Sequence, residues 1–341
     1  MKPVKIAVIG VGHAHAQTNY TAIAAQTDRF ELVGYCTCKG EEAAFEKKAY
    51  TYKNGNRMTF EEIIATPGLE AVAIEAEEMN LTEYALLAAE RGLHIFLDKP
   101  GSADTADFER LLSMMKAKNL TLTMGYMYRH NPAVMRAIER VKSGALGEVY
   151  AVEAQMNGWN DAAQRQWLAN FPGGQLFFLG CHLIDLVLKI QGLPDEIIPL
   201  STRTGFDGAG GEDYGMAAFR YGRGVSIVKS CAAEMGGFMR RQLVIACEKG
   251  TIELQPIEQY ITPVGGCDHV THYRETTDKA WTARAEEEIL GPYNRYKGMS
   301  AAFADAIRSG TVSDYEYEAR LHRVLMAACG VETDWRGEIQ L

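Results

Sequence analysis

The sequence predicts an α/β protein in which a domain with a parallel sheet is followed by a domain with a mostly antiparallel sheet. Up to about residue 125, short apolar runs alternate with segments of helical periodicity. This alternation is typical of strand–helix–strand units with right-handed crossovers. Beyond that point, β-like runs follow one another with tight turns between them, which is typical of antiparallel strands. A length of 341 residues suits two domains, which we place at residues 1–125 and 126–341.

Each element of the first domain is predicted from its apolar pattern and from the turn residues that bound it. The predicted strands are 5–10, 30–37, 71–74, 94–97 and 120–125, and the predicted helices are 14–27, 41–49, 60–65, 81–90 and 103–118.

The second domain is predicted to begin with a helix that Pro132 opens and that ends near Gly144. A strongly amphipathic helix at 175–191 interrupts the run of strands, and two helices close the chain. The predicted strands are 149–156, 197–202, 214–220, 225–231, 243–247, 251–254 and 259–262, and the closing helices are 296–309 and 315–329.

Composition and charge exclude several classes of protein. The net charge of −9 argues against a nucleic-acid partner, because phosphate binding needs clustered Lys and Arg. No run of eighteen apolar residues predicts a membrane span, and the N-terminus lacks the features of a signal peptide. Seven cysteines without a C-x-x-C pair suggest small core residues in a reducing compartment. We therefore expect a cytoplasmic protein.

A glycine-rich turn joins the first predicted strand to the first predicted helix. Gly10 allows a tight turn, and Gly12 lets the backbone approach a pyrophosphate, whose charge faces the amides of His13 and Ala14 at the helix start. His15 replaces the third glycine of the G-x-G-x-x-G pattern. The context nevertheless predicts a dinucleotide-binding Rossmann domain with NAD or NADP over this loop.

Two histidines two positions apart also raise the question of a metal. No further ligand lies near His13 and His15 in the sequence, so we expect no metal site. The alternative that we favour places His13 over the cofactor and His15 in the packing at the helix start.

The end of the second strand normally carries an acid that binds the ribose 2′-hydroxyl. Here Thr37 is neutral and Lys39 is cationic, which favours NADP slightly, since Lys39 can pair with a 2′-phosphate. Alternatively, Lys39 is only a solvated loop residue.

Two residues stand out as catalytic candidates. Lys99 follows an apolar run and is predicted to lie at the carboxyl end of a parallel strand, where ligands bind in open α/β sheets. His182 lies on the amphipathic helix, where spacings of four and three place it on one face with Phe178 and Asp185. Alternatively, Lys99 is a surface lysine at a strand end, and His182 has only a structural role.

These residues, taken together, resemble the glucose–fructose oxidoreductase / inositol dehydrogenase / MocA (Gfo/Idh/MocA) family of NAD(P)-dependent oxidoreductases. The resemblance covers nearly the whole chain. It is carried by Gly10-Val11-Gly12, Asp98-Lys99-Pro100, the segment from Gly125-Tyr126 to Asn131-Pro132, the segment from Gly173-Gly174 to His182-Leu183-Ile184-Asp185, and the segment from Glu248 to Leu254.

The resemblance implies a Rossmann domain followed by an α/β domain with a large open sheet that packs in homodimers or homotetramers. It also implies hydride transfer between nicotinamide and a carbohydrate or cyclic polyol. Lys99 would be the catalytic lysine, and His182 the group that binds and exchanges the hydroxyl proton.

The sequence departs from the family pattern in two places. Phe178 stands where relatives usually have an aspartate, which leads us to expect a neutral His182 and a more apolar site. Acids replace the family's A-T-P-N segment, and we expect one of them, Glu78, to lie near the nicotinamide ribose.

We therefore expect an oxidoreductase acting on CH–OH groups of sugars or polyols. Further substrate-facing candidates are Tyr126, Trp159, Arg165 and Phe178, although a tryptophan at such a position can equally be a core or interface anchor. One alternative is a lyase or glycosidase of this fold that uses bound cofactor for transient oxidation. The other is a non-catalytic protein that senses a sugar or cofactor, which the presence of Lys99 disfavours.

Overall fold

A computed structural model describes residues 2–261 and 268–341 of the chain. It divides into two compact units. The first contains Met1–Tyr126, Tyr296–Ala319 and Glu338–Leu341, and the second contains Met127–Arg295 and Arg320–Gly337. The first boundary lies one residue from the predicted one. The C-terminal segments differ from the expected division, because part of the chain after residue 295 returns to the first unit.

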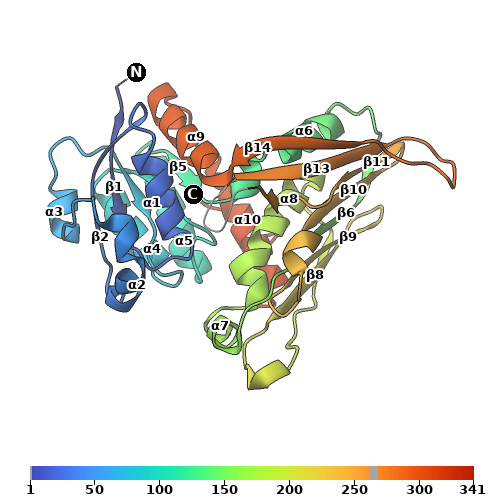
Figure 1. Ribbon diagram of the computed structural model, residues 1–341, viewed down its shortest axis with the longest axis horizontal. Coiled ribbons are helices and arrows are strands. Elements are labelled where there is room, and N and C mark those ends of the chain that lie inside the picture. The colour runs from blue at the N-terminus through green and yellow to red at the C-terminus, as the bar shows by residue number, and fades with distance from the viewer. Residues whose placement is uncertain (1, 262–267) are drawn as a thin grey trace. The chain divides into compact units, whose positions relative to one another are not determined.

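The first unit is built on a five-stranded parallel sheet with the order β2-β1-β3-β4-β5 (Figure 1). Its inner strands are almost wholly buried, as expected for a parallel sheet covered on both faces. The strands are β1 Val4–Ile9, β2 Phe30–Cys36, β3 Ala71–Ile74, β4 His94–Leu97 and β5 Leu122–Met124, and the helices are α1 Ala16–Ala24, α2 Glu42–Tyr52, α3 Phe60–Ile64, α4 Leu81–Glu90 and α5 Thr105–Ala117.

Helix α9 (Arg295–Ser309) completes the core of the first unit. Phe303 packs edge-on against Phe96 of β4, with ring centroids 6.0 Å apart. Arg308 forms an ion pair with Glu70 at 2.7 Å, just before β3. These contacts explain why the helix belongs to the first unit and not to the second.

The second unit contains a nine-stranded sheet with the order β12-β13-β11-β10-β6-β9-β8-β7, to which β14 adds beside β13. The β6–β9 pair is parallel and the other pairs are antiparallel. The strands are β6 Val149–Gln155, β7 Glu196–Pro199, β8 Tyr214–Arg220, β9 Val225–Cys231, β10 Gln242–Cys247, β11 Gly250–Leu254, β12 Gln259–Tyr260, β13 Asp268–Thr276 and β14 Glu287–Asn294.

Helices cover one face of this sheet. Helix α8 (Cys181–Gln191) packs on β6 and β9, and α6 (Pro132–Lys142) packs near β11 and β14. Buried and half-buried residues alternate along β10, so the opposite face is only partly covered. The other helices are α7 Ala162–Trp167 and α10 Tyr315–Ala328, whose last turns belong to this unit. The predicted fold class is confirmed.

Several elements differ from the sequence prediction. The amphipathic segment 175–191 is a π-helical turn, Leu176–Gly180, followed by α8. Strands β13 and β14 and helix α7 were not predicted. The strand expected at 259–262 is the short β12, and residue 262 lies outside the described residues.

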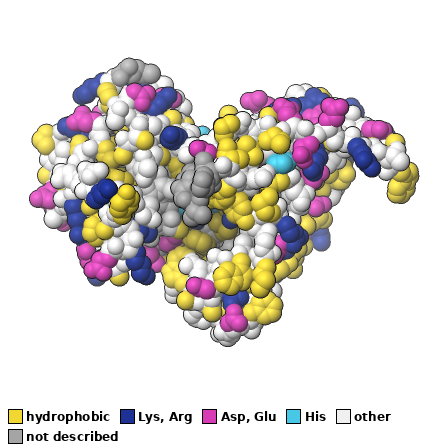
Figure 2. Space-filling model, in the orientation of Figure 1, with side chains coloured by type: hydrophobic (Ala, Val, Ile, Leu, Met, Phe, Trp, Pro, Cys, Tyr) yellow, Lys and Arg dark blue, Asp and Glu magenta, His cyan; other side chains and the backbone are white. Residues whose placement is uncertain are grey.

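Surface charge is mixed over both units. Figure 2 shows Lys and Arg side chains interspersed with Asp and Glu side chains on the visible face of each unit. Among the described residues, no helix has the length and apolar character that crossing a bilayer requires.

Candidate active site

The carboxyl ends of the parallel strands bring the predicted cofactor residues together. Strand β1 lies between β2 and β3, so the chain reverses its winding direction at β1. Ligands bind at such switch points in open α/β sheets. The loop of residues 10–15 lies at this point, between the end of β1 and the start of α1.

Both loop glycines are required by close backbone packing. Gly10 has φ +92°, and a Cβ there would lie 2.3 Å from the backbone nitrogen of Ala76. A Cβ on Gly12 would lie 2.5 Å from Glu41 Oε1 and 2.7 Å from the backbone nitrogen of Glu77. The loop therefore has the close-packed backbone that the fit of a pyrophosphate requires.

Glu41 is a residue of this site that sequence reasoning missed. Its buried carboxylate accepts hydrogen bonds at 2.8 Å from the backbone amides of Val11 and Cys38, and at 2.9 Å from that of Glu77. The sequence argument for the end of β2 considered Thr37 and Lys39 and did not include this carboxylate. Glu41 comes from the start of α2, four residues past Thr37, and its side chain reaches back to the strand.

The two residues that favoured NADP have other contacts in the structure. Thr37 donates its hydroxyl to Glu42 and accepts from Arg57. The backbone amide of Lys39 donates to the hydroxyl of Tyr84. The carboxylate of Glu41 opposes the argument for NADP, whereas the contact of Lys39 involves only its backbone, so the preference between the two cofactors stays a prediction.

Residues on both sides of the loop hold its backbone. The Ala14 amide donates to Glu78 Oε1 at 3.3 Å, and Lys48 Nζ donates to the carbonyls of Val11 and His13. Burial raises the pKa of Glu78 to about 7. The structure places Glu78 beside the loop residues His13 and Ala14, and the contact of these three residues with a cofactor remains a prediction. Lys48 could not be recognised as a site residue from the sequence, because its helix α2 is rich in charged residues and resembles a solvent-exposed helix.

A buried polar cluster lies beneath the loop. His13 Nδ1 is 3.2 Å from Asp98 Oδ2 and 3.8 Å from Glu75 Oε2, and His15 Nδ1 is 3.3 Å from Asp98 Oδ2. Asn19 Nδ2 donates to both carboxyl groups, at 2.7 Å to Glu75 and 2.9 Å to Asp98. Burial lowers the pKa of His13 to about 3 and raises the pKa of Glu75 well above its usual value.

Lys99 follows β4 and is fully buried. Its backbone amide donates to Asp98 Oδ1 at 2.7 Å, and its carbonyl lies 3.0 Å from His13 Nε2. The backbone of the lysine is therefore fixed by two residues of the first unit. Tyr126, also buried, follows β5 at the same sheet edge.

His182 lies in the second unit, in the first turn of α8, and is also buried. Its ring is 5.8 Å from that of Tyr128, edge to face. Asp185, one turn further along α8, accepts two hydrogen bonds from Arg129, at 2.7 and 2.9 Å. The helix face predicted from spacing thus carries a histidine beside a paired carboxylate.

Phe178 lies in the π-helical turn and is part of an aromatic cluster. Its ring stacks on Phe171, with centroids 5.9 Å apart, and meets Trp167 edge-on at 5.1 Å. These contacts give Phe178 a packing role. π-Helical turns are nevertheless frequent at functional sites. The expectation that Phe178 leaves His182 neutral and makes the site more apolar stays a prediction.

The other two substrate candidates differ strongly in exposure. The side chain of Trp159 is 58 % exposed and available to a ligand. Arg165 is buried and pairs with Asp207 at 2.5 Å and with Asp213 at 3.7 Å. Its charge is therefore engaged within the second unit.

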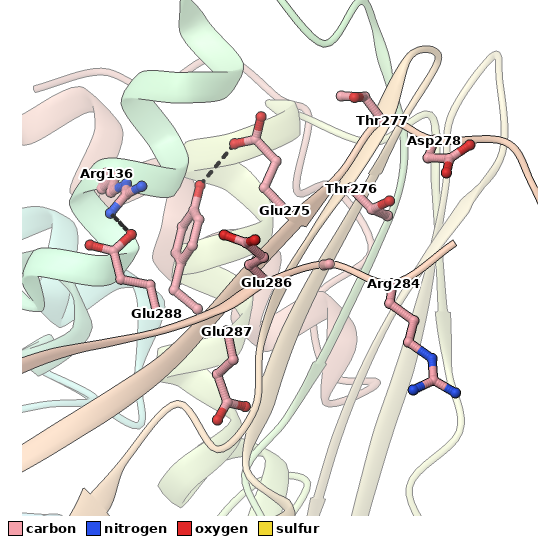
Figure 3. Close-up of a pocket in the computed structure, with 11 residues that line it drawn as sticks. Arg136, Glu275, Thr276, Thr277, Asp278, Arg284, Glu286, Glu287 and Glu288 are labelled. Carbon is pink, nitrogen blue, oxygen red and sulfur yellow. Dashed lines mark hydrogen bonds and ion pairs between the residues drawn. The ribbon is translucent and has the colours of Figure 1, made fainter. Parts of the chain in front are cut away.

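A separate cleft of about 640 Å³ runs along β13 and β14. Figure 3 shows charged side chains along it, with Arg136 paired to Glu288. The hydroxyl of Tyr273 donates a hydrogen bond to Glu275 at 3.1 Å. None of the predicted site residues lines this cleft. Within its lining, Arg136 pairs with Glu288, and Glu275 pairs with Arg140 of α6.

Comparison with known proteins identifies the family. The model of an oxidoreductase family with an NAD-binding Rossmann fold, GFO_IDH_MocA, matches residues 4–126, and the model of the GFO/IDH/MocA C-terminal domain matches residues 134–253. The chain belongs to the Gfo/Idh/MocA family. Its first unit is accordingly the NAD-binding Rossmann domain of an oxidoreductase family.

Individual relatives are distant. The oxidoreductase C26H5.09c of Schizosaccharomyces pombe is 26 % identical over 208 residues, covering 58 % of this chain and 54 % of the relative. The chain thus spans about half the length of that relative. The D-xylose 1-dehydrogenase (NADP(+)) 2 of Haloferax volcanii is 25 % identical over 257 residues, 74 % of each chain.

Solved structures share the fold over nearly the full length. Levoglucosan dehydrogenase, solved in complex with NADH and levoglucosan, superposes with a TM-score of 0.77 at 18 % identity and covers 98 % of both chains. At this identity the likeness shows the fold alone.

Proposed function

We propose that this member of the Gfo/Idh/MocA family oxidises a CH–OH group of a carbohydrate or cyclic polyol, or reduces the corresponding carbonyl, with NAD(P). The observation that carries the proposal is Lys99, a buried lysine at the carboxyl end of β4 whose backbone is fixed next to the phosphate loop. The named relative that acts on D-xylose supports the substrate class.

In this mechanism the chain's own residues bind and orient the reactants. Gly10 and Gly12 would provide the close-packed backbone that the pyrophosphate approaches, and the carboxylate of Glu41 would accept hydrogen bonds from hydroxyls of the adenosine ribose. When bound, the nicotinamide supplies the acceptor or donor of the hydride. Lys99 binds the reacting hydroxyl and accepts its proton as the C–H bond breaks. His182 acts as the second acid–base group.

The test is an assay of the purified protein against sugars and polyols, with NAD⁺ and with NADP⁺, that follows absorbance of the reduced nicotinamide. We expect stoichiometric reduced cofactor with at least one substrate. Product formation without reduced cofactor would instead establish a lyase or glycosidase that oxidises its substrate transiently. Cofactor and sugar binding without turnover would establish a sensing role.

Glu41 predicts the cofactor preference. A 2′-phosphate placed beside a buried carboxylate is repelled, so we expect NAD to bind about tenfold or more tightly than NADP. Glu41→Gln keeps the size of the side chain, removes its charge and should narrow this ratio, as measured by calorimetry. The control is Glu46→Gln, an exposed position on the same helix. If the wild type binds NADP more tightly than NAD, this prediction is wrong and the preference for NADP inferred from Lys39 holds.

We also propose that the chain forms a homodimer or homotetramer through the partly covered face of the nine-stranded sheet. Half-buried apolar residues gather there on three adjacent strands: Ala151, Ile227, Val244 and Ala246. Analytical ultracentrifugation tests this assembly.

The thiols at Cys36, Cys38 and Cys231 are compatible with the reducing cytoplasm, where we propose that the protein is located.

A further inference from the structure

The cluster beneath the phosphate loop brings together four side chains that bind metals. His13 and His15 come from the loop, Glu75 directly follows β3, and Asp98 directly follows β4. One ring nitrogen of His13, one ring nitrogen of His15 and one carboxylate oxygen of Asp98 lie within 4.8 Å of one another. All four residues belong to the first unit.

The distances within the cluster suit a tetrahedral cation. Zinc ligands at about 2.0–2.1 Å from the metal lie about 3.3 Å from one another. Here Asp98 Oδ2 is 3.2 Å from His13 Nδ1 and 3.3 Å from His15 Nδ1. Glu75 Oε2, at 3.8 Å from His13 Nδ1, requires only a small movement.

The groups around the cluster are those that orient metal ligands. His13 Nε2 donates to the carbonyl of Lys99 at 3.0 Å, which leaves the lone pair on Nδ1, and a low pKa keeps the ring neutral. Asn19 Nδ2 bridges the two carboxyl groups. Two hydrogen bonds have to give way: the one that the His15 amide donates to His13 Nδ1 at 3.1 Å, and the one between His15 Nδ1 and the Asp98 carboxylate at 3.3 Å.

An independent observation points to a missing partner for Glu75. The residue has no exposed surface, and its Oε2 atom has no hydrogen-bond donor within residues 2–261 and 268–341. That atom is directed at His13 Nδ1, itself a lone-pair site. Burial raises the pKa of Glu75 well above its usual value, so this carboxyl group requires either a proton or a cation, and a cation between these atoms meets that requirement.

We propose that His13, His15, Glu75 and Asp98 form a structural site for one divalent cation of the zinc class. Two imidazole nitrogens favour zinc over magnesium or calcium, and two carboxylates balance its charge. Four protein ligands leave no open position, so the metal does not act on substrate. It fastens the phosphate loop to the ends of β3 and β4, next to Lys99.

The test uses the full chain, with any affinity tag removed and treated with a chelator, and Co²⁺ as the probe. We expect one Co²⁺ per chain with the strong visible absorption of tetrahedral coordination, displaced by one equivalent of Zn²⁺. Zn²⁺ should also raise the melting temperature of the chelated protein. None of these readouts depends on the cofactor or on activity.

Variants separate the site from adventitious binding. His15→Ala removes the outermost ligand and should abolish the tetrahedral spectrum, and Asn19→Ala, outside the ligand set, should weaken affinity about 10- to 100-fold. His272→Ala, in the second unit, is the control and should bind as the wild type does.

The proposal is overturned if the wild type binds no stoichiometric Co²⁺, if the spectrum is octahedral, or if His15→Ala binds unchanged. In each of these cases the carboxyl pair is held by a proton instead. If His15→Ala does not fold, Asn19→Ala and the metal-dependent melting of the wild type still decide the matter.

Discussion

Replacement of Lys99 by alanine is expected to lower kcat by about two orders of magnitude or more, the usual scale for a positioned acid–base group. The lysine is buried, and its backbone is fixed by Asp98 and His13, so the alanine variant loses an amino group that is attached at a fixed point of the chain. Steady-state kinetics with the substrate found in the sugar and polyol panel measures the effect, and calorimetry should show that NAD(P) still binds.

The matched control for this change is Lys116→Ala, which removes an exposed lysine on α5 of the same unit. Its turnover should equal that of the wild type. Near-normal turnover in Lys99→Ala would remove this lysine from the mechanism. A loss of cofactor binding in the same variant would show that its role is structural.

Replacement of Gly12 by valine should abolish stabilisation by the cofactor. The first added carbon would lie 2.5 Å from Glu41 Oε1 and 2.7 Å from the backbone nitrogen of Glu77. The loop must then move off the edge of the sheet, and its amides lose their approach to the pyrophosphate. The increase in melting temperature with saturating NAD(P) measures the effect, because a ligand stabilises the state that it binds.

Two variants keep this result interpretable. Gly222→Val alters a turn glycine whose added carbon would meet nothing closer than 3.8 Å, and it should respond to cofactor as the wild type does. Gly12→Ala is the milder change if valine prevents folding. A normal response of folded Gly12→Val to NAD(P) would place the cofactor elsewhere.

The local pattern of apolar and turn residues was sufficient to predict the strands and helices of the first unit up to residue 125. Strands such as Ala71–Ile74 and His94–Leu97 were predicted at their observed bounds, because a strand buried on both faces is a continuous apolar run between turn residues. The β14 strand was missed for the opposite reason. Its residues are mostly exposed and acidic at the start, and it forms only because β13 supplies a partner.

The same distinction applies to the candidate site. Gly10, Gly12 and Lys99 were found because strand ends and glycine turns are visible in the sequence. Glu41, Lys48 and Asn19 were missed because each acts through a long-range contact made from a helix. We predicted no further metal ligand near His13 and His15 because none is close to them in the sequence. Glu75 and Asp98 lie close to His13 in space, because the strands that precede them belong to the same sheet as β1.

The return of α9 to the first unit determines when that unit can be completed during synthesis. Phe303, Ser300 and Arg308 bind Phe96, Gln26 and Glu70, which are made some two hundred residues earlier or more. A ribosome must therefore translate the whole nine-stranded sheet before the Rossmann domain receives its last helix. A fragment cut at Tyr126 would lack α9 and expose the apolar surface around Phe96, so we expect it to be less stable than the same domain in the full chain.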